Sequence, residues 1–180
     1  ADKEKQEKIL TNVLENEKIP AITTPYFNFF ELDVLCRMGK LTEVLDKIRS
    51  YWGGMLDLGA VTFWEEYDPS VPKEEQYDMY GDHFGKSLCH AWAASPIYFL
   101  AKYFAGLDLV NKDGVTYILK PQMQYFTELD CTLPVGSNGV VRLVWDGEIL
   151  EITPNADGGI LELGEQKLSL VRGETRRVKI

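Results

Sequence analysis

The spacing of apolar residues changes near Gly106, and this change constrains the fold more than any other feature of the sequence. Before it, apolar residues recur every three or four positions, which is the period of a helix. After it, short β-type runs alternate with turn sequences, which is typical of strands. The pattern predicts an α plus β multidomain chain, with a helical part over residues 1–108, a β part over residues 109–180, and a boundary near residues 107–113.

Four helices are expected in the first part, over residues 3–16, 25–38, 41–52 and 87–106. Thr24 and Pro25 are typical of a helix start, with an N-cap followed by proline at the first helical position. Gly53-Gly54 would stop the third helix, and Pro96 would kink the fourth. The stripe expected to face inward on the second helix consists of Phe27, Phe30, Val34, Leu35 and Met38.

Four helices form two hairpins, and their aromatic-rich loops suggest a toroid of helical hairpins. Two hairpins cannot close such a ring. We therefore expect the chain to begin inside a larger structure, so that helix 3–16 is entered already under way. An apolar surface should then lie exposed, or be covered by a partner, where the other hairpins of the ring belong.

The β part is expected to be a small antiparallel β-sandwich, because short strands at regular spacing with turn sequences between them are typical of that fold. The predicted strands are Val115–Leu119, Gln124–Leu129, Gly139–Trp145, Ile149–Thr153, Gly159–Leu163, Lys167–Val171 and Arg176–Ile180. The predicted turns are 111–114, 136–139, 146–147, 157–159 and 172–173.

Composition excludes several classes of function. A net charge of −9 argues against nucleic acid as a partner, because phosphate binding needs clustered Lys and Arg, and it suits a neutral ligand such as a sugar. Three widely spaced cysteines, Cys36, Cys89 and Cys131, give neither a disulfide framework nor a zinc pattern, and we expect all three to be buried thiols. No apolar run approaches the roughly 20 residues of a membrane span, so no membrane is expected as a partner.

The irregular stretch from about residue 53 to residue 86 is long enough to predict a functional loop. It contains Trp64-Glu65-Glu66-Tyr67-Asp68, in which carboxylates stand beside aromatic rings. Sugar sites use this combination, because rings pack on pyranose faces and a carboxylate can deprotonate water. Packing against Trp64 would raise the pKa of the carboxylate by desolvation. A solvated acidic turn with Trp64 in the core explains the same residues.

Two further segments carry candidate residues. Ser87 looks like the N-cap of the fourth helix, which would place His90 in the first turn, near a ligand or inside the core. Trp92 follows two residues later. The pair Cys89-His90 is not a nucleophile and base, because adjacent helical residues do not face each other. Tyr26, at the start of the second helix, could reach the same end of the helical part, although aromatic residues there more often belong to the core.

These segments together resemble bacterial α-L-rhamnosidases of the six-hairpin group, glycoside hydrolase family 78. The resemblance rests on residues 24–38, 59–69 and 85–105, in this order and spacing, and above all on Thr62-Phe63-Trp64-Glu65 with Ser87-Leu88-Cys89-His90. It continues more weakly into the β part. It implies that residues 1–108 are the last hairpins of an (α/α)6 barrel and that residues 109–180 are the C-terminal β-sandwich domain.

The resemblance also implies a reaction, the hydrolysis of terminal α-L-rhamnosyl bonds with inversion. The Glu that follows Trp would be the general base, Glu65, and Trp64, Tyr67, His90, Trp92 and Tyr26 would bind the sugar. The acidic motif that supplies the family's general acid does not occur here. The chain is therefore expected to be an incomplete enzyme, inactive alone, whose partners are a rhamnose-containing glycoside or polysaccharide and the missing N-terminal part of the same enzyme. No metal or organic cofactor is needed for this chemistry.

Two alternatives stay open from the sequence. The chain could be a noncatalytic carbohydrate-binding or structural module. It could also belong to another six-hairpin enzyme, such as a polysaccharide lyase, although a lyase would need a cationic pocket for uronates and the loop here is acidic.

Overall fold

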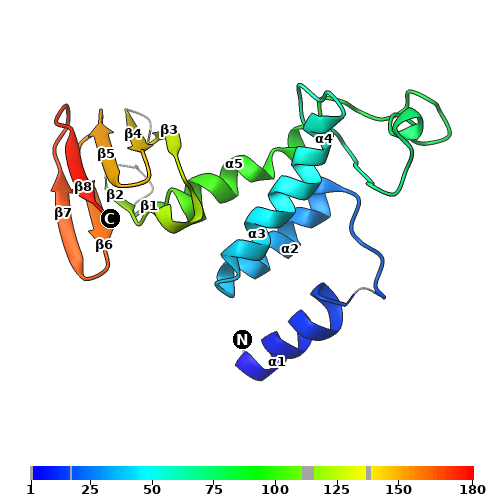
Figure 1. The fold of residues 1–180 in the computed structure, drawn as a ribbon, viewed down its shortest axis with the longest axis horizontal. Helices are drawn as coiled ribbons and strands as arrows, with labels where there is room; N and C mark the ends of the chain where they lie inside the picture. The colour runs from blue at the N-terminus through cyan, green and yellow to red at the C-terminus, as the bar shows by residue number, and fades with distance from the viewer. Residues whose placement is uncertain (1, 17, 111–115, 137–138) are drawn as a thin grey trace. The chain divides into compact units, whose positions relative to one another are not determined.

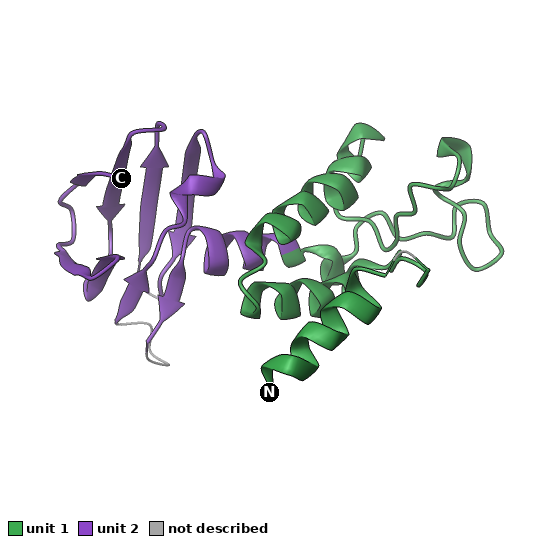
Figure 2. Ribbon diagram, turned by 60° about the horizontal axis from the view of Figure 1, so that its bottom comes forward, with its two compact units in different colours: residues 1–95 green, residues 96–180 purple. Residues whose placement is uncertain are grey.

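The computed structural model describes residues 2–16, 18–110, 116–136 and 139–180 (Figure 1). The chain divides into two compact units, residues 1–95 and residues 96–180 (Figure 2). The predicted turn at residues 111–114, together with Val115, lies outside the described residues, as do two residues of the predicted turn at 136–139.

The first unit contains the expected early helices. Helix α1, Lys3–Ile9, continues through a π-helical turn, Leu10–Leu14, so the prediction of a helix over 3–16 is confirmed within two residues. Helix α2, Pro25–Arg37, begins at the predicted N-cap Thr24, with Pro25 in its first turn. Helix α3, Leu41–Lys47, continues through a π-helical turn, Ile48–Trp52, and packs beside α2 (Figure 1).

The predicted inward stripe of α2 is wrong in most of its members. Phe27 and Phe30 are 57% and 52% exposed, and Val34 is also exposed; only Leu35 is buried as expected. The buried face is instead formed by Asn28, Leu32, Leu35 and Cys36. Helix α2 has apolar residues on two faces, and the sequence did not indicate which face the neighbouring helix covers. Asn28 is tolerated inside because its Nδ2 donates to the carbonyls of Ile22 and Thr24, at 3.2 and 3.3 Å.

The predicted stop at Gly53-Gly54 is also wrong. The helix runs on as α4, Gly53–Asp57, and ends before Gly59, whose φ of +93° is a left-handed conformation that glycine adopts without strain. Gly54 has a packing role, since a Cβ there would lie 2.4 Å from the Tyr67 hydroxyl oxygen. Two adjacent glycines were taken as a helix end, and at least one of them is a point of close contact.

A long irregular segment follows and carries the candidate residues. It contains two short 3-10 turns, Lys73–Glu75 and Ala91–Ala93, before helix α5, Ser95–Phe99, and the π-helical turn Leu100–Phe104. The fourth helix therefore begins at Ser95 and not at Ser87. His90 has extended backbone angles (φ −109°, ψ 106°), so its predicted place in a helical turn is wrong. Pro96 lies in the first turn of α5, where its missing N–H costs nothing, and not at a kink.

The second unit contains two four-stranded sheets. One has the order β1-β2-β6-β7 and the other the order β3-β4-β5-β8. The strands are β1 Leu107–Leu109, β2 Tyr117–Leu119, β3 Leu129–Pro134, β4 Val140–Trp145, β5 Ile149–Pro154, β6 Gly159–Leu163, β7 Gln166–Leu170 and β8 Arg176–Lys179. Both sheets contribute buried residues to one hydrophobic cluster, among them Leu119, Leu143, Ile152 and Leu161.

Six of the seven predicted strands are present, and three details differ. The run Gln124–Leu129 is not a strand: Met123–Tyr125 is a 3-10 turn, and β3 begins only at Leu129. The short strand β1 was not predicted. The pair β2–β6 is parallel, whereas an antiparallel fold was expected, because the chain builds β3, β4 and β5 in the other sheet before β6 returns beside β2.

The cysteines occupy different environments. Cys36 is buried, and burial raises the pKa of its thiol to about 12. Cys131 is half-buried, and Cys89 is exposed, so the prediction that all three are buried thiols is wrong for Cys89. The helices that the structure describes include none long and apolar enough to cross a membrane.

Candidate active site

Two extended segments of the first unit run side by side and bring Glu65 and His90 into one region. The Glu65 amide donates to the Ser87 carbonyl at 2.9 Å, and the His90 amide donates to the Phe63 carbonyl at 2.8 Å. The Thr62 hydroxyl donates to the Leu88 carbonyl. The backbone around both candidate residues is therefore fixed by hydrogen bonds, although neither segment belongs to a helix or a strand.

Each carboxylate oxygen of Glu65 accepts a different hydrogen bond. The Tyr80 hydroxyl donates to Oε1 at 2.7 Å, and the Ser87 amide donates to Oε2 at 3.1 Å. The Tyr80 bond first, then the Ser87 bond, and more weakly the charges of His90 and Lys86, hold the Glu65 pKa below its ordinary value. The expectation that packing on Trp64 raises this pKa is wrong, because hydrogen bonds to the charged form outweigh desolvation.

Glu66 is bound to other partners. Its Oε1 accepts from the Thr23 hydroxyl at 2.8 Å, and its Oε2 lies 3.9 Å from the Lys86 ammonium, whose side chain is only 3% exposed. Burial lowers the pKa of Lys86, and Glu66 is the first of the nearby carboxylates that oppose this effect. The expectation that Glu66 is bonded to a neighbouring loop is confirmed. Only Glu65 is left with a carboxylate free of a cationic partner within ion-pair distance, among the described residues.

The aromatic candidates lie in two environments. Trp64 is buried, with its ring edge 5.6 Å from the Tyr77 ring, and presents no open face to a sugar. Trp92 is 68% exposed, and its ring lies 5.2 Å from the ring of Tyr26 and 5.8 Å from the His90 ring. Three of the predicted site residues, His90, Trp92 and Tyr26, therefore form one exposed cluster. Exposed rings of this kind can pack against the apolar face of a pyranose.

Tyr67 is drawn to the opposite side of the loop. Its amide donates to the Thr23 carbonyl at 3.0 Å, its ring lies 5.6 Å from the Tyr51 ring, and its hydroxyl reaches the surface of Gly54. Tyr67 and Asp68 line a cleft of about 590 Å³ with Thr23, Lys47 and other residues, and Glu65 and His90 do not line it. The structure thus separates Tyr67 from the His90–Trp92–Tyr26 cluster.

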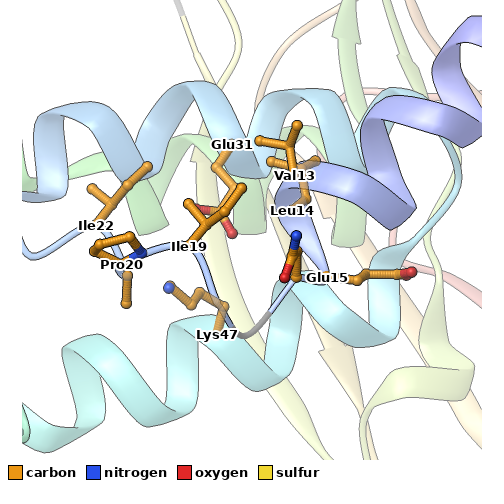
Figure 3. A pocket seen from close by; sticks show the side chains of 10 residues that line it. Val13, Leu14, Glu15, Ile19, Pro20, Ile22, Glu31 and Lys47 are labelled. Atoms are coloured by element: carbon orange, nitrogen blue, oxygen red, sulfur yellow. The ribbon is translucent and has the colours of Figure 1, made fainter.

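A second cleft of about 530 Å³ continues along the segment that precedes α2. The side chains of Ile19, Pro20 and Ile22 form one wall, and Glu31 of α2 and Lys47 of α3 extend towards it (Figure 3). A third, smaller cavity of about 140 Å³ is apolar and is lined by Trp52, Met55 and residues 60–63, among others. None of these three spaces contains Glu65 among its lining residues.

Two functional candidates were missed by sequence reasoning. Tyr80 was one of several aromatic residues in the long loop, and its contact with Glu65 depends on a turn 15 residues further along the chain. Lys86 is buried against the acidic loop, which its flanking sequence did not indicate. In the part of the chain that the structure describes, no three His, Cys, Asp or Glu side chains could together hold a metal ion.

No protein-family model matches this chain, and no curated protein matches it. Among solved structures, the GH78 family rhamnosidase of Bacillus sp. GL1 matches 88% of the chain with a TM-score of 0.66 and 23% sequence identity. The chain matches part of a GH78 rhamnosidase structure. A rhamnosidase from Klebsiella oxytoca, solved with rhamnose bound, matches 57% of the chain with a TM-score of 0.50 and 33% identity.

The chain covers only 17% of the Bacillus GH78 rhamnosidase and 20% of the Klebsiella rhamnosidase. It thus corresponds to a small portion of each enzyme. The match to the GH78 rhamnosidases agrees with the family resemblance of residues 24–38, 59–69 and 85–105. Four helices followed by two small four-stranded sheets are therefore a piece of the rhamnosidase fold.

Proposed function

We propose that these residues form part of an inverting α-L-rhamnosidase and supply its general base, Glu65. The first unit would be the last hairpins of an (α/α)6 barrel, and the second unit would be the β-domain that follows it. A second carboxylate, the general acid, would come from a part of the enzyme outside these 180 residues. The rhamnosidase-like fold and the separate environments of Glu65 and Glu66 support this proposal.

The observation that carries the proposal is the state of the Glu65 carboxylate. A general base must be ionised, and its oxygens must be able to accept a proton from water. The hydrogen bonds from Tyr80 and Ser87 favour the ionised form of Glu65, and each occupies a different oxygen. Each oxygen keeps a further lone pair, because an ionised carboxylate has about four acceptor sites.

The reaction would use the two carboxylates on opposite faces of the sugar. The acid would protonate the glycosidic oxygen as its bond to the anomeric carbon breaks. Glu65 would take a proton from a water molecule that attacks the anomeric carbon from the other side, which inverts its configuration. Inverting pairs stand about 6.5–9.5 Å apart to leave room for this water. His90, Trp92 and Tyr26 would hold the rhamnosyl ring, and Trp64 would pack behind Glu65.

The test compares the two neighbouring glutamates. In a protein that joins these residues to the acid-bearing part of the enzyme, Glu65→Gln should lower the turnover of an aryl α-L-rhamnoside by about 10²–10⁴-fold, the usual value of general-base catalysis. Glu66→Gln removes a carboxylate of the same size one residue away and should change turnover far less. The 180 residues alone should show none. Near-normal turnover by Glu65→Gln would overturn the proposal.

A noncatalytic carbohydrate-binding module is the second candidate. The exposed Trp92–Tyr26 pair favours it, because aromatic faces bind sugars without any catalytic carboxylate. Such a module would bind rhamnosides equally well with Glu65→Gln and would not increase hydrolysis when joined to the acid-bearing part.

A further inference from the structure

The loop between the two segments of the candidate site ends in a strained turn. Among the residues that the structure describes, Tyr80 is the one non-glycine residue with positive φ, at +56°. It precedes Gly81, and the two residues are enclosed by reciprocal hydrogen bonds between Met79 and Asp82, at 2.9 and 3.0 Å. Two-residue turns of this kind favour Asn-Gly, because a bulky side chain is disfavoured at positive φ.

The rest of the loop holds this turn in place. The Lys86 amide donates to the Tyr77 carbonyl at 3.2 Å, and the rings of Tyr77 and Phe84 stack at 6.4 Å. Gly85 is required by space, since a Cβ there would lie 2.1 Å from the Met79 carbonyl oxygen. The position of residue 80 is therefore determined by contacts on both sides of it.

Burial does not explain why a tyrosine occupies the strained position. Tyr80 is 79% exposed, so its ring gains little from the hydrophobic effect. Its hydroxyl donates to Glu65 Oε1 at 2.7 Å, opposite the Ser87 amide on Oε2. Strained residues persist where the surrounding structure holds them, and they cluster at functional sites.

We propose that Tyr80 is a positioning residue for Glu65, held over it by the strained turn so that its hydroxyl fixes the orientation of the carboxylate. The contact itself is independent of the catalytic role, and its consequence for the reaction rests on the proposed function. Without the hydroxyl, Glu65 is held at Oε2 only and can rotate about its terminal bond. A misplacement of about 1 Å in a catalytic group can cost on the order of 10²-fold in rate.

The hydroxyl also affects ionisation, together with the other groups near Glu65. His90 and Lys86 both favour the ionised form of Glu65, and the Lys86 charge is shared with Glu66, Asp68 and Asp78. The Tyr80 bond is the largest of these effects on the Glu65 pKa. Its removal should therefore raise the Glu65 pKa towards its ordinary value.

The direct test is a pH titration of the Glu65 carboxyl carbon by 13C NMR in the 180-residue chain, with the resonance assigned from Glu65→Gln. Tyr80→Phe keeps the ring and removes the hydroxyl, so the Glu65 midpoint should move to higher pH. Tyr80→Asn suits the positive φ and also lacks the phenol, and it should move the midpoint in the same direction even if Phe disturbs the turn. Tyr77→Phe, the matched control in the same loop, should leave the midpoint where it is.

An unchanged Glu65 midpoint in both Tyr80 variants would overturn the proposal. The kinetic consequence is tested separately in the protein that also carries the general acid. There Tyr80→Phe should lower kcat by about 10-fold or more with little change in KM, and should shift the acid limb of the pH profile upwards. If Glu65→Gln leaves turnover intact while the NMR shift occurs, the proposed function fails and the link between Tyr80 and Glu65 stands.

Discussion

Replacement of Gly54 by alanine tests how the helix positions the candidate loop. Gly53 and Gly54 are neighbours in α4, and alanine is favoured over glycine by about 1 kcal/mol inside a helix. At Gly53 nothing lies within 4 Å of the added Cβ, so Gly53→Ala should be neutral or stabilising by up to about 1 kcal/mol. At Gly54 the Cβ would lie 2.4–2.6 Å from the Tyr67 hydroxyl and ring.

This overlap forces the Tyr67 ring away from the helix. Overpacking of this kind costs about 1–3 kcal/mol, which equals or exceeds the gain in helix propensity. The Gly54→Ala chain should therefore be less stable than the Gly53→Ala chain by about 1–3 kcal/mol. Urea unfolding followed by circular dichroism at 222 nm measures this difference. Equal stabilisation by the two alanines would show that Tyr67 does not rest on Gly54, and the account of the helix passing through both glycines would lose its physical reason.

Two further changes test the support of the site. Trp52→Phe removes the hydrogen bond from the indole Nε1 to the Ala93 carbonyl, 2.8 Å in length and buried, and should lower the free energy of unfolding by about 1–3 kcal/mol, measured by the same urea titration. Lys86 has a pKa lowered by burial, so it opposes folding below that pKa, and stability should rise with pH as the solution approaches its ordinary value of 10.5. Lys86→Met should abolish this alkaline rise in pH-dependent unfolding experiments, and a rise of equal size in the variant would contradict the assignment to Lys86.

The helices were predictable where local chemistry decides the structure. Thr24-Pro25 starts a helix in almost any context, because proline suits the first turn and not the interior. Gly53-Gly54 and Ser87 were misinterpreted because their roles depend on partners distant in sequence, Tyr67 for the first and the paired segment 62–65 for the second. The exposed face of α2 could not be distinguished from its buried face, because both carry large apolar residues.

The candidate site was predictable in its residue types and not in its geometry. A carboxylate pair next to aromatics, followed by a histidine, pointed to Glu65 and His90, and the structure places their segments side by side. Tyr80 could not be found, because nothing local indicates that residue 80 contacts residue 65. The expected rise in the Glu65 pKa was wrong for the same reason, since it considered Trp64 and not the hydroxyl of Tyr80. Likewise, the parallel pairing of β2 with β6 depends on how the chain crosses between sheets.

The central claim, that Glu65 activates the attacking water, is tested most directly by chemical rescue. In the protein that also carries the general acid, Glu65→Ala removes the base and leaves space beside the anomeric carbon for azide, an anion that needs no deprotonation. With an aryl α-L-rhamnoside, azide should restore turnover and yield β-L-rhamnosyl azide, identified by 1H NMR, because it enters on the face opposite the leaving group. Rescue of Glu66→Ala in place of Glu65→Ala, or an azide product of α configuration, would contradict the account.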